Sequence, residues 1–175
     1  MLLTPSERHR LALTAVVAAA IWSLLGWQQL GGGVPSHSFL ARDDMPAISN
    51  WWGALVLPLL TWFAIGDVQA RIARSATGSR AARLGFVGGA LYGAVLAVAY
   101  SLGYTAIPSL QLQAIPFIAI VVPIFRVEVV LGFVIAMSYT FGAVLPTVIG
   151  TLLACVGAVV YLAPRWLVRR VRKGR

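Results

Sequence analysis

One feature constrains this chain more than any other: from Leu84 to Pro164 the sequence contains only two charged residues, Arg126 and Glu128. The whole chain is 59% hydrophobic and 11% charged, with a mean hydropathy of +0.85. A soluble domain of 175 residues needs more polar side chains than this to cover its surface. We therefore expect an all-α, polytopic integral membrane helix bundle.

Six apolar segments are predicted to be transmembrane helices. They cover residues 11–30, 51–67, 84–104, 108–125, 127–145 and 147–163 and precede a basic tail at 164–175, so residues 1–175 form a single transmembrane domain. The last three segments average roughly 18 residues, close to the lower limit for crossing a hydrocarbon core of about 30 Å. The alternative is four spans plus a re-entrant hairpin, because Gln111, Gln113, Pro116 and Pro123 interrupt the fourth segment.

The positive charges orient these spans. With six crossings, the N-terminus, the loop before residue 84, the turn at Arg126 and the tail all lie on one side, which receives thirteen of the fourteen Lys and Arg residues. Only Arg42 lies opposite. The positive-inside rule then places both termini in the cytoplasm, and we expect a multi-pass protein of the cell (inner or plasma) membrane. The net charge of +9 is an orientation signal on this interpretation, so no nucleic-acid partner is expected.

The titratable side chains offer little for catalysis. Lys173 is the sole lysine and lies in the tail, which excludes a retinal Schiff base within the bundle, and His9 and His37 lie on opposite sides, which excludes a bis-histidine haem. Nucleotide-binding, serine-hydrolase and zinc-protease motifs are absent from the sequence. Asp43, Asp44 and His37 in the outer loop are more typical of a solvated turn than of a cation site. We expect no enzymatic activity, no cofactor and no metal.

Four charged residues near the cytoplasmic boundary are the first candidate site. Asp67 and Arg71 are four residues apart, the spacing of an ion pair on one helix face. Arg126 and Glu128 project about 200° apart on a helix, so each needs a different partner. One interpretation is a charged turn that anchors a hairpin, with Arg126 on lipid phosphate or on Asp67. The other is an Asp67–Arg126–Glu128 cluster that gates a substrate path or docks a partner.

Uncharged polar residues are the second candidate site. Gln111, Gln113 and Tyr139 lie in the last three spans and are candidates to line a cavity that binds a small molecule. The alternative is ordinary hydrogen bonding between helices. Other residues with the same two possible roles are Tyr92, Tyr100, Ser138, Thr140, Thr147 and Thr151.

Small residues and the basic tail indicate contacts with helices and lipid. Gly85, Gly89 and Gly93 recur every four residues and predict tight packing of the third helix against a neighbour, while Ala15 and Ala19 form a second small-residue face available to a protein partner. The tail is expected to anchor on anionic lipid. Its anchoring residues are Trp166, Arg169, Arg170 and Arg172.

In size and predicted topology, the chain resembles the substrate-binding subunits of energy-coupling-factor vitamin transporters, whose first helix also carries an A-x-x-x-A face like that of Ala15 and Ala19. The resemblance implies a transport role and names no substrate. We expect a protein that binds or moves a small molecule as one component of a larger transporter. The alternative is a non-catalytic accessory or assembly subunit that supplies packing surface to a membrane complex. A polar, ligand-binding cavity favours the first function, and a solid interior with exposed small-residue grooves favours the second.

Overall fold

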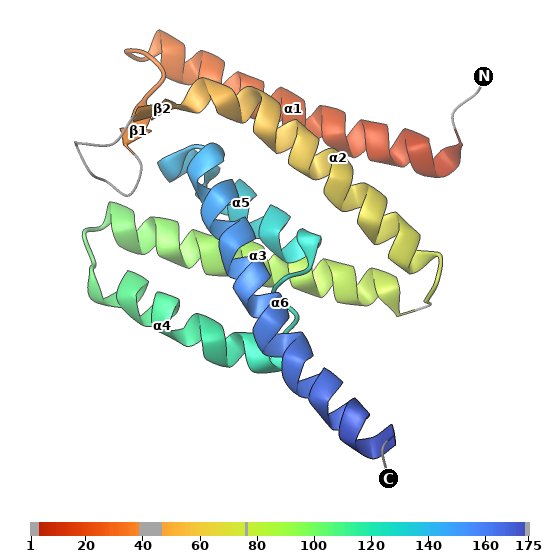
Figure 1. Cartoon of the computed structure of the whole chain (residues 1–175). Helices are drawn as coiled ribbons and strands as arrows, with labels where there is room; N and C mark the ends of the chain where they lie inside the picture. The colour runs from red at the N-terminus through yellow and green to blue at the C-terminus, as the bar shows by residue number, and fades with distance from the viewer. Residues whose placement is uncertain (1–3, 39–46, 76, 174–175) are drawn as a thin grey trace.

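The computed structural model describes residues 4–38, 47–75 and 77–173, and within them the chain forms a bundle of six α-helices (Figure 1). This confirms the all-α prediction. The helices are α1 (Pro5–Leu30), α2 (Gly53–Ile72), α3 (Gly78–Ser101), α4 (Ala106–Val121), α5 (Val127–Phe141) and α6 (Val144–Lys173). A short antiparallel pair, β1 (Ser36–Ser38) and β2 (Ala47–Ser49), followed by the 3-10 turn η2 (Asn50–Trp52), joins α1 to α2.

The start of α1 illustrates how local sequence sets a helix boundary. The Thr4 backbone N–H donates to the Glu7 carboxylate at 2.8 Å, and the Glu7 N–H donates back to the Thr4 hydroxyl at 3.3 Å. This is a capping box with Pro5 in the first turn, which satisfies backbone N–H groups that have no partner within the helix. At the other end the helix stops where Gly32 and Gly33 take positive φ angles of 129° and 108°.

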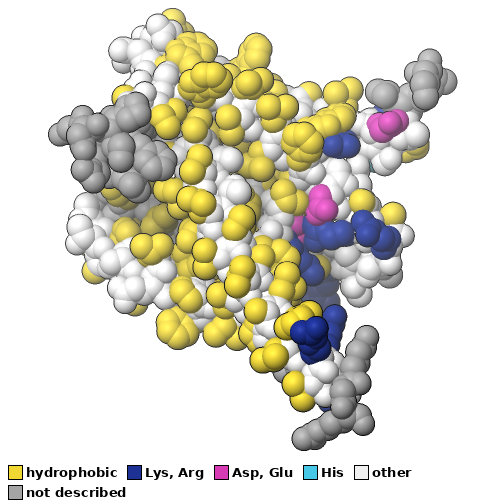
Figure 2. Space-filling view, in the orientation of Figure 1, with side chains coloured by type: hydrophobic (Ala, Val, Ile, Leu, Met, Phe, Trp, Pro, Cys, Tyr) yellow, Lys and Arg dark blue, Asp and Glu magenta, His cyan; other side chains and the backbone are white. Residues whose placement is uncertain are grey.

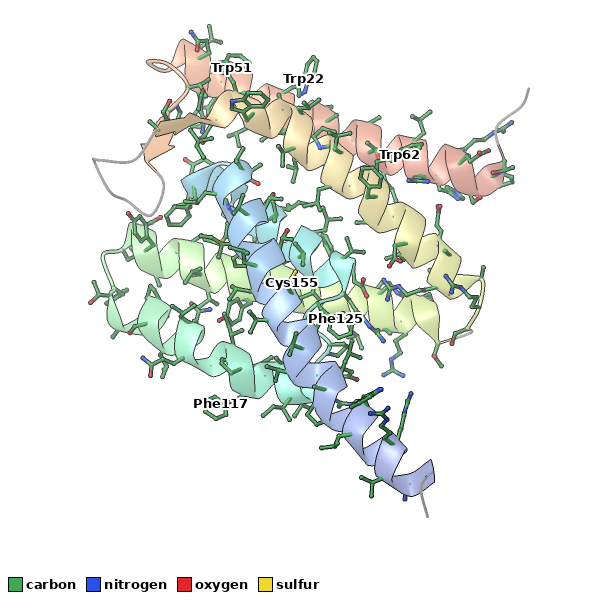
Figure 3. The ribbon with its side chains drawn as sticks, in the orientation of Figure 1. Trp22, Trp51, Trp62, Phe117, Phe125 and Cys155 are labelled. Atoms are coloured by element: carbon green, nitrogen blue, oxygen red, sulfur yellow. The ribbon has the colours of Figure 1, made fainter. Side chains whose placement is uncertain are left out.

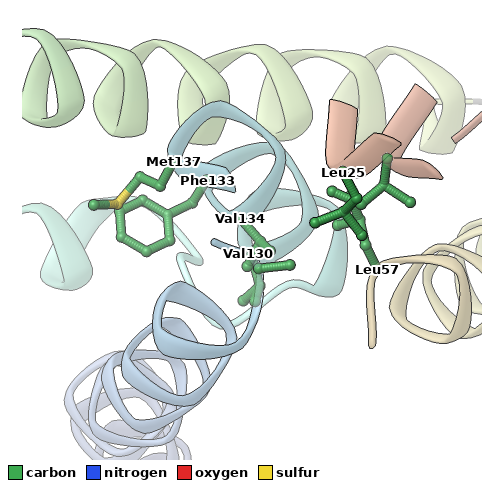
Figure 4. Packing of buried hydrophobic residues seen from close by; sticks show 8 residues of the cluster. Leu25, Leu57, Val130, Phe133, Val134 and Met137 are labelled. Carbon is green, nitrogen blue, oxygen red and sulfur yellow. The ribbon is translucent and has the colours of Figure 1, made fainter. Parts of the chain in front are cut away.

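The short helix α5 forms the centre of the bundle and packs against α2, α3 and α6. Its contact with α3 is the closest, because the glycine stripe of α3 faces the α5 backbone. A side chain at Gly89 would collide with the Val129 carbonyl, and a Cβ at Gly93 would lie 2.8 Å from the Phe133 carbonyl oxygen. The predicted tight packing of this stripe is confirmed. Figure 4 shows the adjoining apolar core, whose members include Leu25, Leu57, Val130, Phe133, Val134 and Met137.

Helix boundaries differ from the predicted spans mainly by extension into charged segments. Helix α2 continues to Ile72, α3 begins at Gly78, and α6 runs through the predicted tail as far as Lys173. Hydropathy identifies the apolar part of a helix, whereas backbone hydrogen bonding continues beyond it. Among the described residues, four helices are long and apolar enough to cross a membrane, namely α1, α2 with η2, α3 and α6. Helices α4 and α5 have 16 and 15 residues, about 24 and 22 Å in length.

The outer surface is apolar over a broad area, and the charged side chains gather at one end. Figure 2 shows hydrophobic side chains over most of the visible face and Lys and Arg side chains on the right. The start of α1, the end of α2 and the end of α6 point toward that side, while the β1–β2 pair and the α3–α4 connection lie on the left (Figure 1). Trp22 and Trp51 project outward near the left end, and Trp62 lies nearer the charged end (Figure 3). Aromatic residues near both ends of an apolar belt are typical of membrane proteins.

Candidate functional site

A partly buried ion network joins α2 to α5 at the charged end of the bundle. The Arg71 Nη1 donates to Glu128 Oε1 at 3.0 Å, Nη2 donates to Oε2, and Nε donates to Asp67 Oδ2 at 2.9 Å. The Glu128 side chain is only 4% exposed, compared with 27% for Arg71 and 55% for Asp67. One planar guanidinium therefore serves two carboxylates.

This geometry differs from the Asp67–Arg126–Glu128 cluster, which was one of the two interpretations of the sequence. The Asp67–Arg71 pair is present as expected, but the cation that connects Asp67 with Glu128 is Arg71 and not Arg126. Arg126 immediately precedes α5, is half-buried, and makes no ion pair within residues 4–38, 47–75 and 77–173. Glu128, in the first turn of α5, packs against Gly85 of α3, where a Cβ would lie 3.0 Å from its Cγ. The absence of a side chain at Gly85 gives the carboxylate room beside Arg71.

Arg10 is a second cation at this end of the bundle that the sequence reasoning missed. Its Nε donates to the Trp62 carbonyl at 2.8 Å, and its guanidinium stacks 3.9 Å from the centre of the Trp62 ring. Gly66 provides the space, because a Cβ there would lie 2.7 Å from the Arg10 Cζ. The sequence did contain a pattern that could have predicted this contact. Arg10 lies at the start of the first predicted span and Trp62 lies near the end of the second, so antiparallel helices bring the two to the same end.

The polar residues proposed as a ligand site form bonds within the bundle or lie on its surface. The Tyr92 hydroxyl donates to the Gln111 carbonyl at 2.6 Å, and the Gln111 side-chain amide donates to the Tyr92 carbonyl at 3.1 Å, which joins α3 to α4. Ser138 bonds to a carbonyl of its own helix. Gln113 and Tyr139 are exposed. These side chains do not converge on one polar cavity.

The bundle instead contains an apolar cavity of about 270 Å³ between α3, α4, α5 and α6. Apart from the Tyr92 hydroxyl, its lining consists of aliphatic or aromatic side chains and glycines. One end lies beside Leu84 and Ile124, and the other beside Tyr92 and Phe133. The full lining is Leu84, Gly85, Gly88, Gly89, Tyr92, Ile115, Ile118, Val122, Ile124, Val129, Val130, Phe133, Gly150, Leu153 and Ala154.

A second apolar cavity, of about 220 Å³, continues beyond Phe133. It is lined by Leu96 and Tyr100 of α3, by Pro108 of α4, and by residues around the α5–α6 turn. Phe133 lines both cavities and is itself buried. The two cavities therefore lie in sequence along α3 and α5, with the Phe133 ring at their common wall.

The predicted tail forms the last part of α6 and presents an exposed aromatic and cationic surface. The Arg170 guanidinium stacks 4.6 Å from the centre of the Trp166 ring, and Arg169 and Arg172 are exposed. No cluster of three potential metal ligands occurs in the part of the chain that the structure describes. Asp43 and Asp44, predicted to form a solvated turn rather than a cation site, lie outside the described residues.

Comparisons with known protein families, with curated proteins and with solved structures find no match to this chain.

Proposed function

We propose that the chain is a multi-pass protein of the cell membrane in which all six helices cross the bilayer and both termini face the cytoplasm. The helix order supports this arrangement, because successive connections alternate between the two ends of the bundle (Figure 1). Helix α5 can be short because neighbouring helices rather than lipid surround it, whereas the exposed α4 can cross as a short helix only where the bilayer thins locally. Helix α5, the shortest, is also the helix with the most buried residues.

Within this arrangement, the protein binds or moves a small apolar molecule as one component of a larger transporter. The observation that carries the proposal is the pair of cavities on either side of Phe133. Ligand pockets are typically about 300–1,000 Å³ and mostly apolar, and the larger cavity lies just below this range. The predicted transport role is kept, whereas the polar cavity considered from sequence is replaced by an apolar one.

A matched pair of glycine substitutions tests this function. Gly88 lines the larger cavity, and Gly26 lies on α1 away from it; a Cβ at either position meets no atom within 4 Å. Gly88→Leu should fill the cavity without disturbing the backbone, and Gly26→Leu is the control. Mass spectrometry of solvent extracts from the purified proteins should show an apolar compound bound to the wild type and to Gly26→Leu but depleted in Gly88→Leu. Equal amounts in all three proteins would contradict the proposal.

A second candidate function, the accessory or assembly subunit, is favoured by the surface of α1. Only Ile21 and Leu25 of this helix are buried, while Ala15 and Ala19 are exposed. Small residues allow close approach of another helix in a membrane. Purification in mild detergent with identification of co-purifying proteins tests it: a partner retained by the wild type and lost on Ala15→Leu would favour this function.

A further inference from the structure

Three arginines lie near the charged end of the larger cavity, two of them close in sequence to residues that line it and the third in contact with the end of α4. Arg126 lies between two lining residues, Ile124 and Val129, and Arg83 directly precedes a third, Leu84. Arg165 of α6 reaches the last turn of α4, where its Nη2 donates to the Ile120 carbonyl at 3.2 Å. The three cations thus come from α3, from the α4–α5 turn and from α6.

These arginines have no anionic partner among the described residues. The two carboxylates nearest in the fold, Asp67 and Glu128, are both occupied by Arg71. Basic pockets between helices on the cytoplasmic side of a membrane are suited to anionic lipid headgroups, and a guanidinium matches phosphate geometry through two parallel N–H donors. The end of the cavity therefore carries uncompensated positive charge at the level where headgroups lie in the proposed topology.

The cavity is also open at this end. Leu84 is 63% exposed and Val122 is 43% exposed, yet both line the cavity. An apolar chain can therefore enter from the side, between α3 and the end of α4, without passing through the charged network around Arg71. Such an opening suits a molecule that already lies in the bilayer.

Resting on the proposed function, we infer that the larger cavity takes one acyl chain of an anionic phospholipid from the cytoplasmic leaflet, with its phosphate at Arg83, Arg126 and Arg165. The apolar lining suits the acyl chain, and the three arginines, which have no anionic partner among the described residues, favour an anionic over a zwitterionic headgroup; Arg165 also stacks 3.5 Å from the centre of the Tyr161 ring. Arg126 is the most informative of the three, because it is half-buried at the rim and has no other partner among the described residues.

Lipid retention after reconstitution tests this assignment. The protein is placed in vesicles of phosphatidylcholine containing phosphatidylglycerol with the same acyl chains, extracted in mild detergent, and the retained lipids are quantified per protein. The wild type should be enriched in phosphatidylglycerol, and Arg126→Gln should lower this enrichment roughly fivefold. Arg126→Lys should keep most of it. Arg74→Gln, which removes an exposed arginine of the α2–α3 segment, is the matched control and should keep all of it.

The outcomes separate this inference from the function on which it rests. If Gly88→Leu depletes the bound molecule while Arg126→Gln leaves the phosphatidylglycerol enrichment unchanged, the cavity function stands and the lipid assignment fails. If Gly88→Leu changes nothing, both fail. Equal loss in Arg74→Gln and Arg126→Gln would also overturn the assignment, since it would indicate a general surface charge effect. Oleate can be added to the same vesicles as a free fatty acid. If the extracted protein retains oleate and no phosphatidylglycerol, a free fatty acid occupies the cavity and the phospholipid assignment is overturned.

Discussion

At the scale of single residues, the most consequential contact is the one between Arg71 and Glu128. A carboxylate that is 4% exposed has lost nearly all of its water, and only a well-placed cation and hydrogen bonds offset that cost. The Arg71 guanidinium supplies both. The bond from Arg71 Nε to Asp67 fixes the orientation of the guanidinium plane.

Removing Arg71 should therefore leave an uncompensated buried charge. We predict that Arg71→Gln lowers the free energy of unfolding by about 3 kcal/mol, at the lower end of the range for broken buried pairs because Arg71 is partly exposed. Arg74→Gln should change it by less than about 0.5 kcal/mol. Adding Glu128→Gln to Arg71→Gln should recover part of the loss. Thermal denaturation in mild detergent measures these differences.

Arg126→Gln distinguishes the observed network from the one predicted from sequence. Because Arg126 makes no ion pair among the described residues, its substitution should leave stability near that of Arg74→Gln. A loss as large as that of Arg71→Gln would indicate that Arg126, and not Arg71, neutralises Glu128.

The sequence predicted the Asp67–Arg71 ion pair but not the Arg71–Glu128 ion pair. Asp67 and Arg71 are one helical turn apart, so their pairing follows from spacing alone. Glu128 is 57 residues from Arg71, and only the packing of α5 between α2 and α3 brings the two together. Such a contact depends on helix rotation and depth, which hydropathy does not encode.

At the scale of elements, the α3–α5 contact depends on glycines, whose lack of a side chain lets the two backbones approach. Gly85, Gly89 and Gly93 place the two backbones close together, and Gly132 of α5 meets the Phe86 carbonyl from the opposite side. Since lipid is as apolar as a helix surface, close packing is what distinguishes helix–helix from helix–lipid contact in a membrane. The four-residue spacing of these glycines made the stripe predictable, whereas its partner helix was not.

Two neighbouring glycines allow this packing to be tested. Gly89→Ala should push Val129 away and lower stability by about 1–3 kcal/mol. Gly88→Ala enters open space and should leave stability unchanged or slightly higher, because alanine favours helix more than glycine does. Thermal denaturation of both variants in the same detergent gives the comparison. Similar stability of the two would contradict the close α3–α5 contact.

At the scale of the whole molecule, composition and charge predicted an all-helical bundle with a charged end, but they did not predict the nature of its interior. The polar residues of α3 to α6 had two predicted roles, lining a ligand cavity or hydrogen bonding between helices, and several of them bond to helix carbonyls. In an apolar environment a hydroxyl or amide gains most from the nearest backbone acceptor. What remains between the helices is apolar space, whose shape follows from packing and cannot be seen in sequence.

In the proposed topology all six helices cross the membrane, which places the Arg126 turn in the cytoplasm. Cysteine labelling tests it directly in a background in which the exposed Cys155 is replaced by serine. With a membrane-impermeant thiol reagent, Arg126→Cys and Thr77→Cys should label only from the cytoplasmic side, and Tyr104→Cys only from the outside. Labelling of Arg126→Cys from the outside, or from neither side while the two controls behave as stated, would contradict six crossings and favour four spans with a re-entrant hairpin.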